Sequence, residues 1–135
     1  MKKILLVEDN PGDVMLVMRH MDSLAAGEFE VQNVHCVRDG LQCLNRTGFD
    51  AILLDLFLPD AWGLQAIADF YAANPLVPII VLTGYYDERT TLHALRLGAA
   101  EYLCKDNMDW DALVKTMRRL TDHKSDGSLQ PASKR

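Results

Sequence analysis

A chain of 135 residues has the length of one ordinary domain, and 49% hydrophobic residues are enough to build a core. Its 14 basic and 19 acidic residues give a net charge of −5, and no basic cluster exceeds Arg118-Arg119, which argues against nucleic acid as the main partner. No apolar stretch is long enough to span a membrane, and the run after Met1 stops at Glu8-Asp9, too early for a signal peptide. We therefore expect a cytoplasmic domain with no direct DNA binding and no membrane insertion.

Short apolar runs alternate with amphipathic segments along the chain. Strands are expected over 3–7, 29–37, 51–54, 78–82 and 101–104. Helical faces are expected at 14–21, 39–44, 64–71, 87–98 and 110–120. Asp39 and Asp87 are placed to cap the second and fourth of these helices. The last residues turn polar, so we expect a domain over 1–122 and a flexible tail over 123–135.

The pattern predicts five strands alternating with five helices. The segment 29–37 is the weaker strand candidate, but strands that read as continuous Ile, Leu and Val runs are typical of a parallel sheet buried on both faces by helices. Right-handed crossovers leave few topologies, so the expected fold class is α/β with a doubly wound, five-stranded parallel sheet. In such sheets ligands bind outside the carboxyl ends of the strands, which makes the residues at those ends the candidates for function.

Acidic, hydroxyl and basic residues follow the strands in a pattern that points to one site. Glu8-Asp9 follow the first strand, Asp55 the third, Thr83 the fourth and Lys105 the fifth. A single residue of this kind after a strand is usually an ordinary turn residue or helix cap. Several of them at the same edge of one sheet indicate a functional site. Two carboxylates about 4 Å apart repel by roughly 4 kcal/mol at an effective dielectric constant near 20, which favours a bound Mg²⁺. The set suits phosphoryl transfer, with Asp55 as a plausible carboxylate nucleophile.

These residues and their spacing resemble the receiver domain of bacterial two-component response regulators, a CheY-like domain. The resemblance covers about residues 2–120. It extends to the loop from Asp55 to Pro59 that precedes Gly63, to the segment 82–84, and to the segment 98–103. It implies a flavodoxin-like sheet in the order 2-1-3-4-5.

The resemblance also implies a phosphoacceptor site. Asp55 would accept a phosphoryl group from a sensor histidine kinase or a histidine phosphotransfer protein. Mg²⁺ would be bound by Asp55, by Asp9, by Glu8 directly or through water, and by the backbone carbonyl of Phe57. The domain would catalyse only its own phosphorylation and dephosphorylation, so it is not expected to be an enzyme in the usual sense.

Three further positions acquire switch roles by the same resemblance. Thr83 would hydrogen-bond the phosphoryl group, Lys105 would pair with it, and Tyr102 would be the aromatic side chain that changes position. The output surface would lie within residues 87–120 and contact a protein target that the sequence does not name. About fifteen polar residues follow the last helix, so no DNA-binding module is expected there.

Two features depart from the family's usual pattern. Asp106 follows Lys105 where the family usually has proline, often with a cis bond. A cis bond without proline costs about 2.5–4 kcal/mol, so a trans peptide is expected. Phe57 and Tyr85 are bulky at positions that tune water access in the family, which suggests a longer-lived phosphoryl group.

The sequence leaves three alternatives to a receiver domain. A metal-dependent phosphatase would use a second Asp two residues after the nucleophile, where this chain has Phe57. A flavodoxin-like cofactor binder would need a phosphate loop after the first strand, where Glu8-Asp9 would repel a phosphate. The remaining alternative is a receiver-like interaction module that is never phosphorylated.

Overall fold

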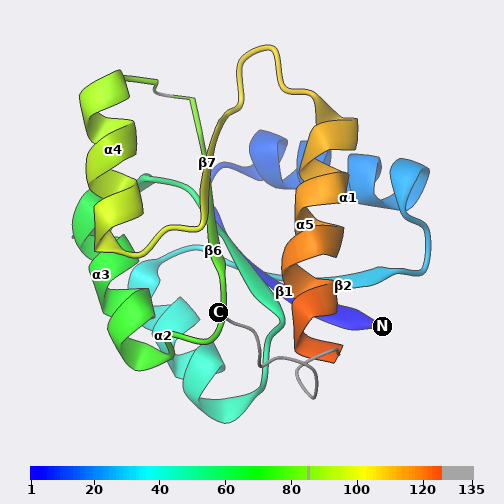
Figure 1. The fold of residues 1–135 in the computed structure, drawn as a ribbon, viewed down its shortest axis with the longest axis horizontal. Helices are drawn as coiled ribbons and strands as arrows, with labels where there is room; N and C mark the ends of the chain where they lie inside the picture. Colours follow the sequence, from blue (N-terminus) through cyan, green and yellow to red (C-terminus); the bar gives the residue numbers. More distant parts are fainter. Residues whose placement is uncertain (85, 126–135) are drawn as a thin grey trace.

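Five parallel strands form one sheet in a computed structural model of the chain, which describes residues 1–84 and 86–125 (Figure 1). The strands are β1 (Lys2–Val7), β2 (Phe29–Val34), β3 (Ala51–Leu54), β6 (Ile79–Thr83) and β7 (Glu101–Cys104). Their order is β2-β1-β3-β6-β7, which is the expected 2-1-3-4-5 when the parallel strands alone are counted. The predicted doubly wound architecture is confirmed.

Helices cover both faces of the sheet (Figure 1). One layer holds α1 (Pro11–Leu24) and α5 (Trp110–Ser125), and the other holds α2 (Val37–Arg46), α3 (Gly63–Ala73) and α4 (Glu88–Leu97). Side chains along a strand alternate between faces, so Leu5 and Val7 pack towards α2 to α4 while Ile4 and Leu6 pack towards α1 and α5. Burial on both faces explains the uninterrupted apolar runs. Among the described helices, none is long and apolar enough to cross a membrane.

The register of the central strands brings two acidic residues to one edge. Val7 pairs with Leu54 in the parallel ladder between β1 and β3. The Asp55 N–H continues that ladder, donating to the Val7 carbonyl at 3.0 Å. Glu8 and Asp55 therefore leave the sheet as neighbours, although 46 residues of chain separate them.

Side chains cap two of the helices, and the cap of α4 is the one that the sequence predicts. The Asn10 side chain caps α1 by accepting a hydrogen bond from the Asp13 N–H at 3.0 Å, and Pro11 occupies the first helical position. The Asp87 side chain caps α4 by accepting from the Thr90 N–H at 2.9 Å. Both caps stand at the carboxyl edge of the sheet, so they also fix the loops that border the candidate site.

The second helix begins differently from the prediction, and Asp39 is not its cap. Helix α2 starts at Val37, and Cys36 at its N-cap position makes no side-chain capping bond. Asp60, from the loop after β3, instead accepts from the Val37 N–H at 3.0 Å and the Arg38 N–H at 3.1 Å. Burial alone would raise the pKa of Asp60, but these backbone bonds outweigh it and lower the pKa.

Some element boundaries also differ. Strand β2 ends at Val34, three residues earlier than expected. A short antiparallel hairpin of β4 (Phe57–Leu58) and β5 (Ala61–Trp62) precedes α3 and was not predicted. Helix α5 continues to Ser125, three residues into the expected tail. Residues 126–135 lie outside the described part of the chain, so the tail there stays a prediction.

Gly98, at the end of α4, is expected to be sensitive to substitution. It has a φ of +123°, and a Cβ there would lie 2.6 Å from the Tyr71 ring. Gly98→Ala should therefore lower the free energy of unfolding by about 1–3 kcal/mol, measured by urea denaturation. Gly48→Ala, at an exposed glycine with open space around it, is the matched control and should change stability by less than about 0.5 kcal/mol. Equal losses in the two variants would contradict this account.

Candidate functional site

Three carboxyl groups gather where β1 and β3 end. Oxygen atoms of Glu8, Asp9 and Asp55 all lie within 4.8 Å of one another. Glu8 and Asp55 are buried, whereas Asp9 is exposed. Like charges this close cannot all stay ionised without a cation or a raised pKa. The cluster therefore has the chemistry of a site for a hard divalent cation.

An open hollow of about 480 Å³ lies over the acid cluster. It is lined by Asp9, Asn10, Asp13, Asp55, Phe57, Gly84, Lys105 and Asp106. Most of these residues come from the loops after β1, β3, β6 and β7, while Asp13 lies in the first turn of α1 and Phe57 in β4. The hollow is mostly polar and open to solvent, so a small charged group can reach Asp55.

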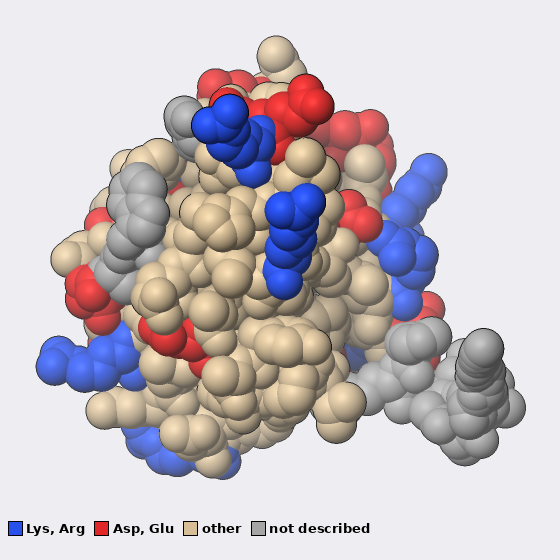
Figure 2. All heavy atoms as spheres, turned by 60° about the vertical axis from the view of Figure 1, so that its left-hand side comes forward, with Lys and Arg blue, Asp and Glu red and all other residues tan. Residues whose placement is uncertain are grey.

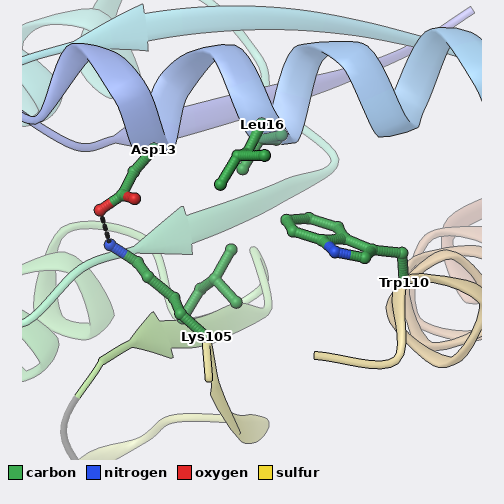
Figure 3. A pocket seen from close by; sticks show the side chains of 6 residues that line it. Asp13, Leu16, Lys105 and Trp110 are labelled. Atoms are coloured by element: carbon green, nitrogen blue, oxygen red, sulfur yellow. Dashed lines mark hydrogen bonds and ion pairs between the residues drawn. The ribbon is translucent and has the colours of Figure 1, made fainter. Parts of the chain in front are cut away.

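The Lys105 ammonium is surrounded by three carboxylates. Its Nζ lies 2.6 Å from Glu8 Oε1, 2.7 Å from Asp13 Oδ2 and 3.5 Å from Asp55 Oδ2. Figure 3 shows the contact with Asp13, which reaches Lys105 from the first turn of α1. Burial alone would lower the pKa of Lys105, but the Asp13 and Glu8 carboxylates outweigh it and raise the pKa. Lys105 is therefore a permanent positive charge in the site.

Glu8 has an unusual protonation equilibrium. Burial, with a smaller contribution from the charge of Asp55, raises the pKa of Glu8 to about 7. The hydrogen bonds from Lys105 at 2.6 Å and from the Asn10 N–H at 3.1 Å act in the opposite direction but do not cancel the effect of burial. Burial therefore makes Glu8 easier to protonate than an ordinary exposed glutamate.

The predicted switch residues lie on the two neighbouring strands. Thr83 is fully buried at the end of β6 and pairs with Cys104 of β7. The Lys105 N–H donates to the Thr83 carbonyl at 2.7 Å, so the backbone joins these two residues directly. Tyr102 is partly buried on β7, and its ring lies edge-on to that of Tyr86, with the ring centroids 6.3 Å apart. Lys105 thus lines the hollow, Thr83 is buried next to Gly84, which also lines it, and Tyr102 lies on β7.

Phe57, one of the two bulky residues expected at the rim, lines the hollow. Phe57 is 52% exposed, and its N–H donates to Asp55 Oδ1 at 3.3 Å. Tyr85, the other predicted rim residue, lies outside the described part of the chain. The described residues contain no cis peptide, as expected for Lys105-Asp106, and the chain then turns at Asn107 with a φ of +56°.

Sequence reasoning missed Asp13. Its signal was available, since a residue in the first turn of a helix that follows β1 lies at the same edge as Glu8 and Asp9. The helix dipole alone explains an acidic residue in a first helical turn, so the position of Asp13 did not by itself indicate an ion pair with Lys105.

Comparison with known proteins identifies relatives of the whole domain. The profile of the response regulator receiver domain matches residues 4–118. The swarming motility regulation protein RssB of Serratia marcescens is 37% identical over 102 residues, covering 76% of this chain and 45% of RssB. The transcriptional regulatory protein ZraR of Escherichia coli is 27% identical over 120 residues, covering 89% of this chain and 26% of ZraR.

A solved structure shares the fold. The receiver domain of the sensor histidine kinase PA1611 from Pseudomonas aeruginosa is 29% identical, with a TM-score of 0.77 over 90% of this chain and 98% of that domain. That structure has a magnesium ion coordinated in its active-site cleft.

A doubly wound sheet with carboxylates, a threonine and a lysine at its carboxyl edge defines a class of phosphoacceptor signalling domains. The profile match covers most of the chain, and the chain belongs to the response regulator receiver domain family. It spans about a quarter of ZraR and less than half of RssB. The family match supports the phosphoacceptor role and not the module that is never phosphorylated.

Proposed function

We propose that this domain is a phosphoacceptor switch in which Asp55 takes a phosphoryl group from a histidine kinase or a histidine phosphotransfer protein. The observation that carries the proposal is the position of Asp55. It follows β3, a strand whose residues are all buried, and it lies within 4.8 Å of Glu8 and Asp9 and 3.5 Å from the Lys105 ammonium. Asp55 thus faces an open hollow, with the Lys105 ammonium and two further carboxyl groups beside it.

The transfer uses a carboxylate oxygen of Asp55 as the nucleophile. This oxygen forms a new bond to phosphorus while the bond from phosphorus to the donor histidine nitrogen breaks. The electron pair of the broken bond stays on that nitrogen, which takes a proton from water. Lys105 neutralises one phosphoryl oxygen and the Thr83 hydroxyl hydrogen-bonds another, so positioning and charge account for the catalysis.

The donor set fits Mg²⁺. Glu8, Asp9 and Asp55 offer the hard oxygen ligands that this ion prefers, and the Phe57 carbonyl is the further ligand that the family suggests. When bound, the ion would neutralise and orient the phosphoryl oxygens. The exposed position of Asp9 leaves one side of the cluster open to the phosphoryl donor.

The signal would leave through protein contacts rather than through a reaction on a second substrate. The new charge at Asp55 draws Thr83 and Lys105 towards it and biases Tyr102, which shifts the surface around α4, β7 and α5. Figure 2 turns the side of α3 and α4 towards the reader and shows mainly uncharged side chains there. Tyr86, Leu92 and Leu95 are exposed large hydrophobic residues in this region, which suits a protein target.

Intact mass spectrometry tests the proposal. After incubation with acetyl phosphate and Mg²⁺ the domain should gain one phosphoryl group, and the gain should vanish without Mg²⁺ and in Asp55→Asn. Asp111→Asn, at an exposed carboxylate on α5, is the matched control and should be phosphorylated like the native domain. No adduct from either acetyl phosphate or a phosphorylated histidine kinase would overturn the proposal.

A further inference from the structure

We propose that Asp13 is a positioning residue that holds Lys105 on α1 in the unphosphorylated domain and competes with the phosphoryl group for it. The inference rests on the proposed function and adds a residue to it. Of the three carboxylates around Lys105, the phosphoacceptor Asp55 is the most distant, at 3.5 Å, whereas Asp13 lies at 2.7 Å. The resting contacts of the ammonium are therefore directed to Glu8 and Asp13.

The backbone of Asp13 is held in place at the start of α1. Its own N–H is bonded to the Asn10 side chain, and the preceding Pro11 sets the first turn of α1. Its side chain is 33% exposed, while that of Lys105 is 17% exposed. The Lys105 ammonium is largely buried, so it would lose an ion-pair partner if it moved away from Asp13. The contact with Asp13 therefore helps to set the resting position of the lysine side chain.

The ion pair between Asp13 and Lys105 borders two hollows, one polar and one mainly apolar. One is the open polar hollow over the acid cluster. The other is a small hollow of about 30 Å³, lined on its apolar side by Leu16, Val17, Leu82 and Trp110 (Figure 3). Movement of the ammonium towards Asp55 therefore changes the wall of a space between α1 and α5. Trp110 there is stacked on His20 of α1, with ring centroids 4.1 Å apart.

The consequence is a competition with a definite sign. A phosphoryl group on Asp55 carries close to two negative charges and attracts Lys105 away from Asp13. The contact with Asp13 stabilises only the resting arrangement, so it shifts the equilibrium away from the phosphorylated one. Removing the Asp13 carboxylate should favour the phosphorylated arrangement without touching Asp55.

Calorimetric titration with beryllofluoride at saturating Mg²⁺ measures this competition, since beryllofluoride binds as a mimic of the phosphoryl group. Asp13→Asn should bind it about three- to tenfold more tightly than the native domain, and Asp13→Glu should restore most of the native affinity. Asp106→Asn is the matched control, because Asp106 lines the same hollow but makes no ion pair with Lys105 in the described structure.

A double-mutant cycle separates the proposal from a general effect of charge. If Asp13 acts through Lys105, Asp13→Asn should change the beryllofluoride affinity little in a Lys105→Met background. An equal gain in that background, an equal gain in Asp106→Asn, or no gain in Asp13→Asn would each overturn the inference. Loss of the phosphoryl adduct in the native domain would instead refute the proposed function, so the two failures are distinguishable.

Discussion

Replacing Lys105 with methionine is expected to strengthen Mg²⁺ binding by about tenfold or more and to lower the Tm of the metal-free domain. Lys105 contacts Glu8, Asp13 and Asp55, and its removal leaves their charges without a partner. The free energy of binding of a divalent cation to the cluster is then more favourable than it is when the positive charge of Lys105 is present. Methionine keeps the apolar stem that lies beside Trp110, so packing changes little.

Calorimetry at increasing Mg²⁺ gives both quantities. The expected result is a larger rise of Tm with Mg²⁺ in Lys105→Met than in the native domain, starting from a lower Tm without metal. Lys115→Met, at an exposed position on α5, is the control and should leave both quantities unchanged. An unaltered Mg²⁺ affinity in Lys105→Met would mean that the charge of Lys105 does not weaken the binding of Mg²⁺ to the acid cluster.

The rule that parallel strands end at one edge accounts for the part of the site that was predictable. It placed Glu8, Asp55 and Lys105 together from sequence positions far apart, and the structure joins all three in one cluster. Apolar runs define such strands clearly, because burial on both faces leaves no polar positions in them. The ends of β1 and β3 are therefore well marked, and with them the residues that face the site, whereas the more polar β2 ends earlier than expected.

Contacts made by helices and loops were harder to predict. Asp39 had the position of a helix cap, yet α2 is capped by Asp60, which lies more than twenty residues further along the chain. Asp13 was not among the predicted site residues, although its carboxylate reaches Lys105 from a neighbouring element. Both interactions depend on the phase of a helix and the path of a loop in three dimensions. Local sequence patterns do not carry that information.

The pKa of Glu8 predicts how pH acts on the metal-free domain. The carboxyl group has a pKa of about 7 in the folded chain against an ordinary value of 4.5. Between these values the folded state binds more protons than the unfolded state, so stability should fall as pH rises from about 4.5 to about 7 and stay low above it. Glu8→Gln removes this titration, and its stability relative to the native domain should be greatest near pH 8 and smallest near pH 5.

Thermal unfolding in a chelator across this pH range measures the difference, which is at most on the order of a few kcal/mol. Glu28→Gln is a control of opposite sign, because the hydrogen bond from Arg118 lowers the pKa of Glu28 and stabilises the fold only while that carboxyl is ionised. Mg²⁺ should reverse the behaviour at Glu8, since the ion binds the ionised carboxylate and releases its proton near neutral pH. Equal pH profiles for the native domain and Glu8→Gln would show that Glu8 is already ionised in the resting cluster and that Lys105 alone balances its charge.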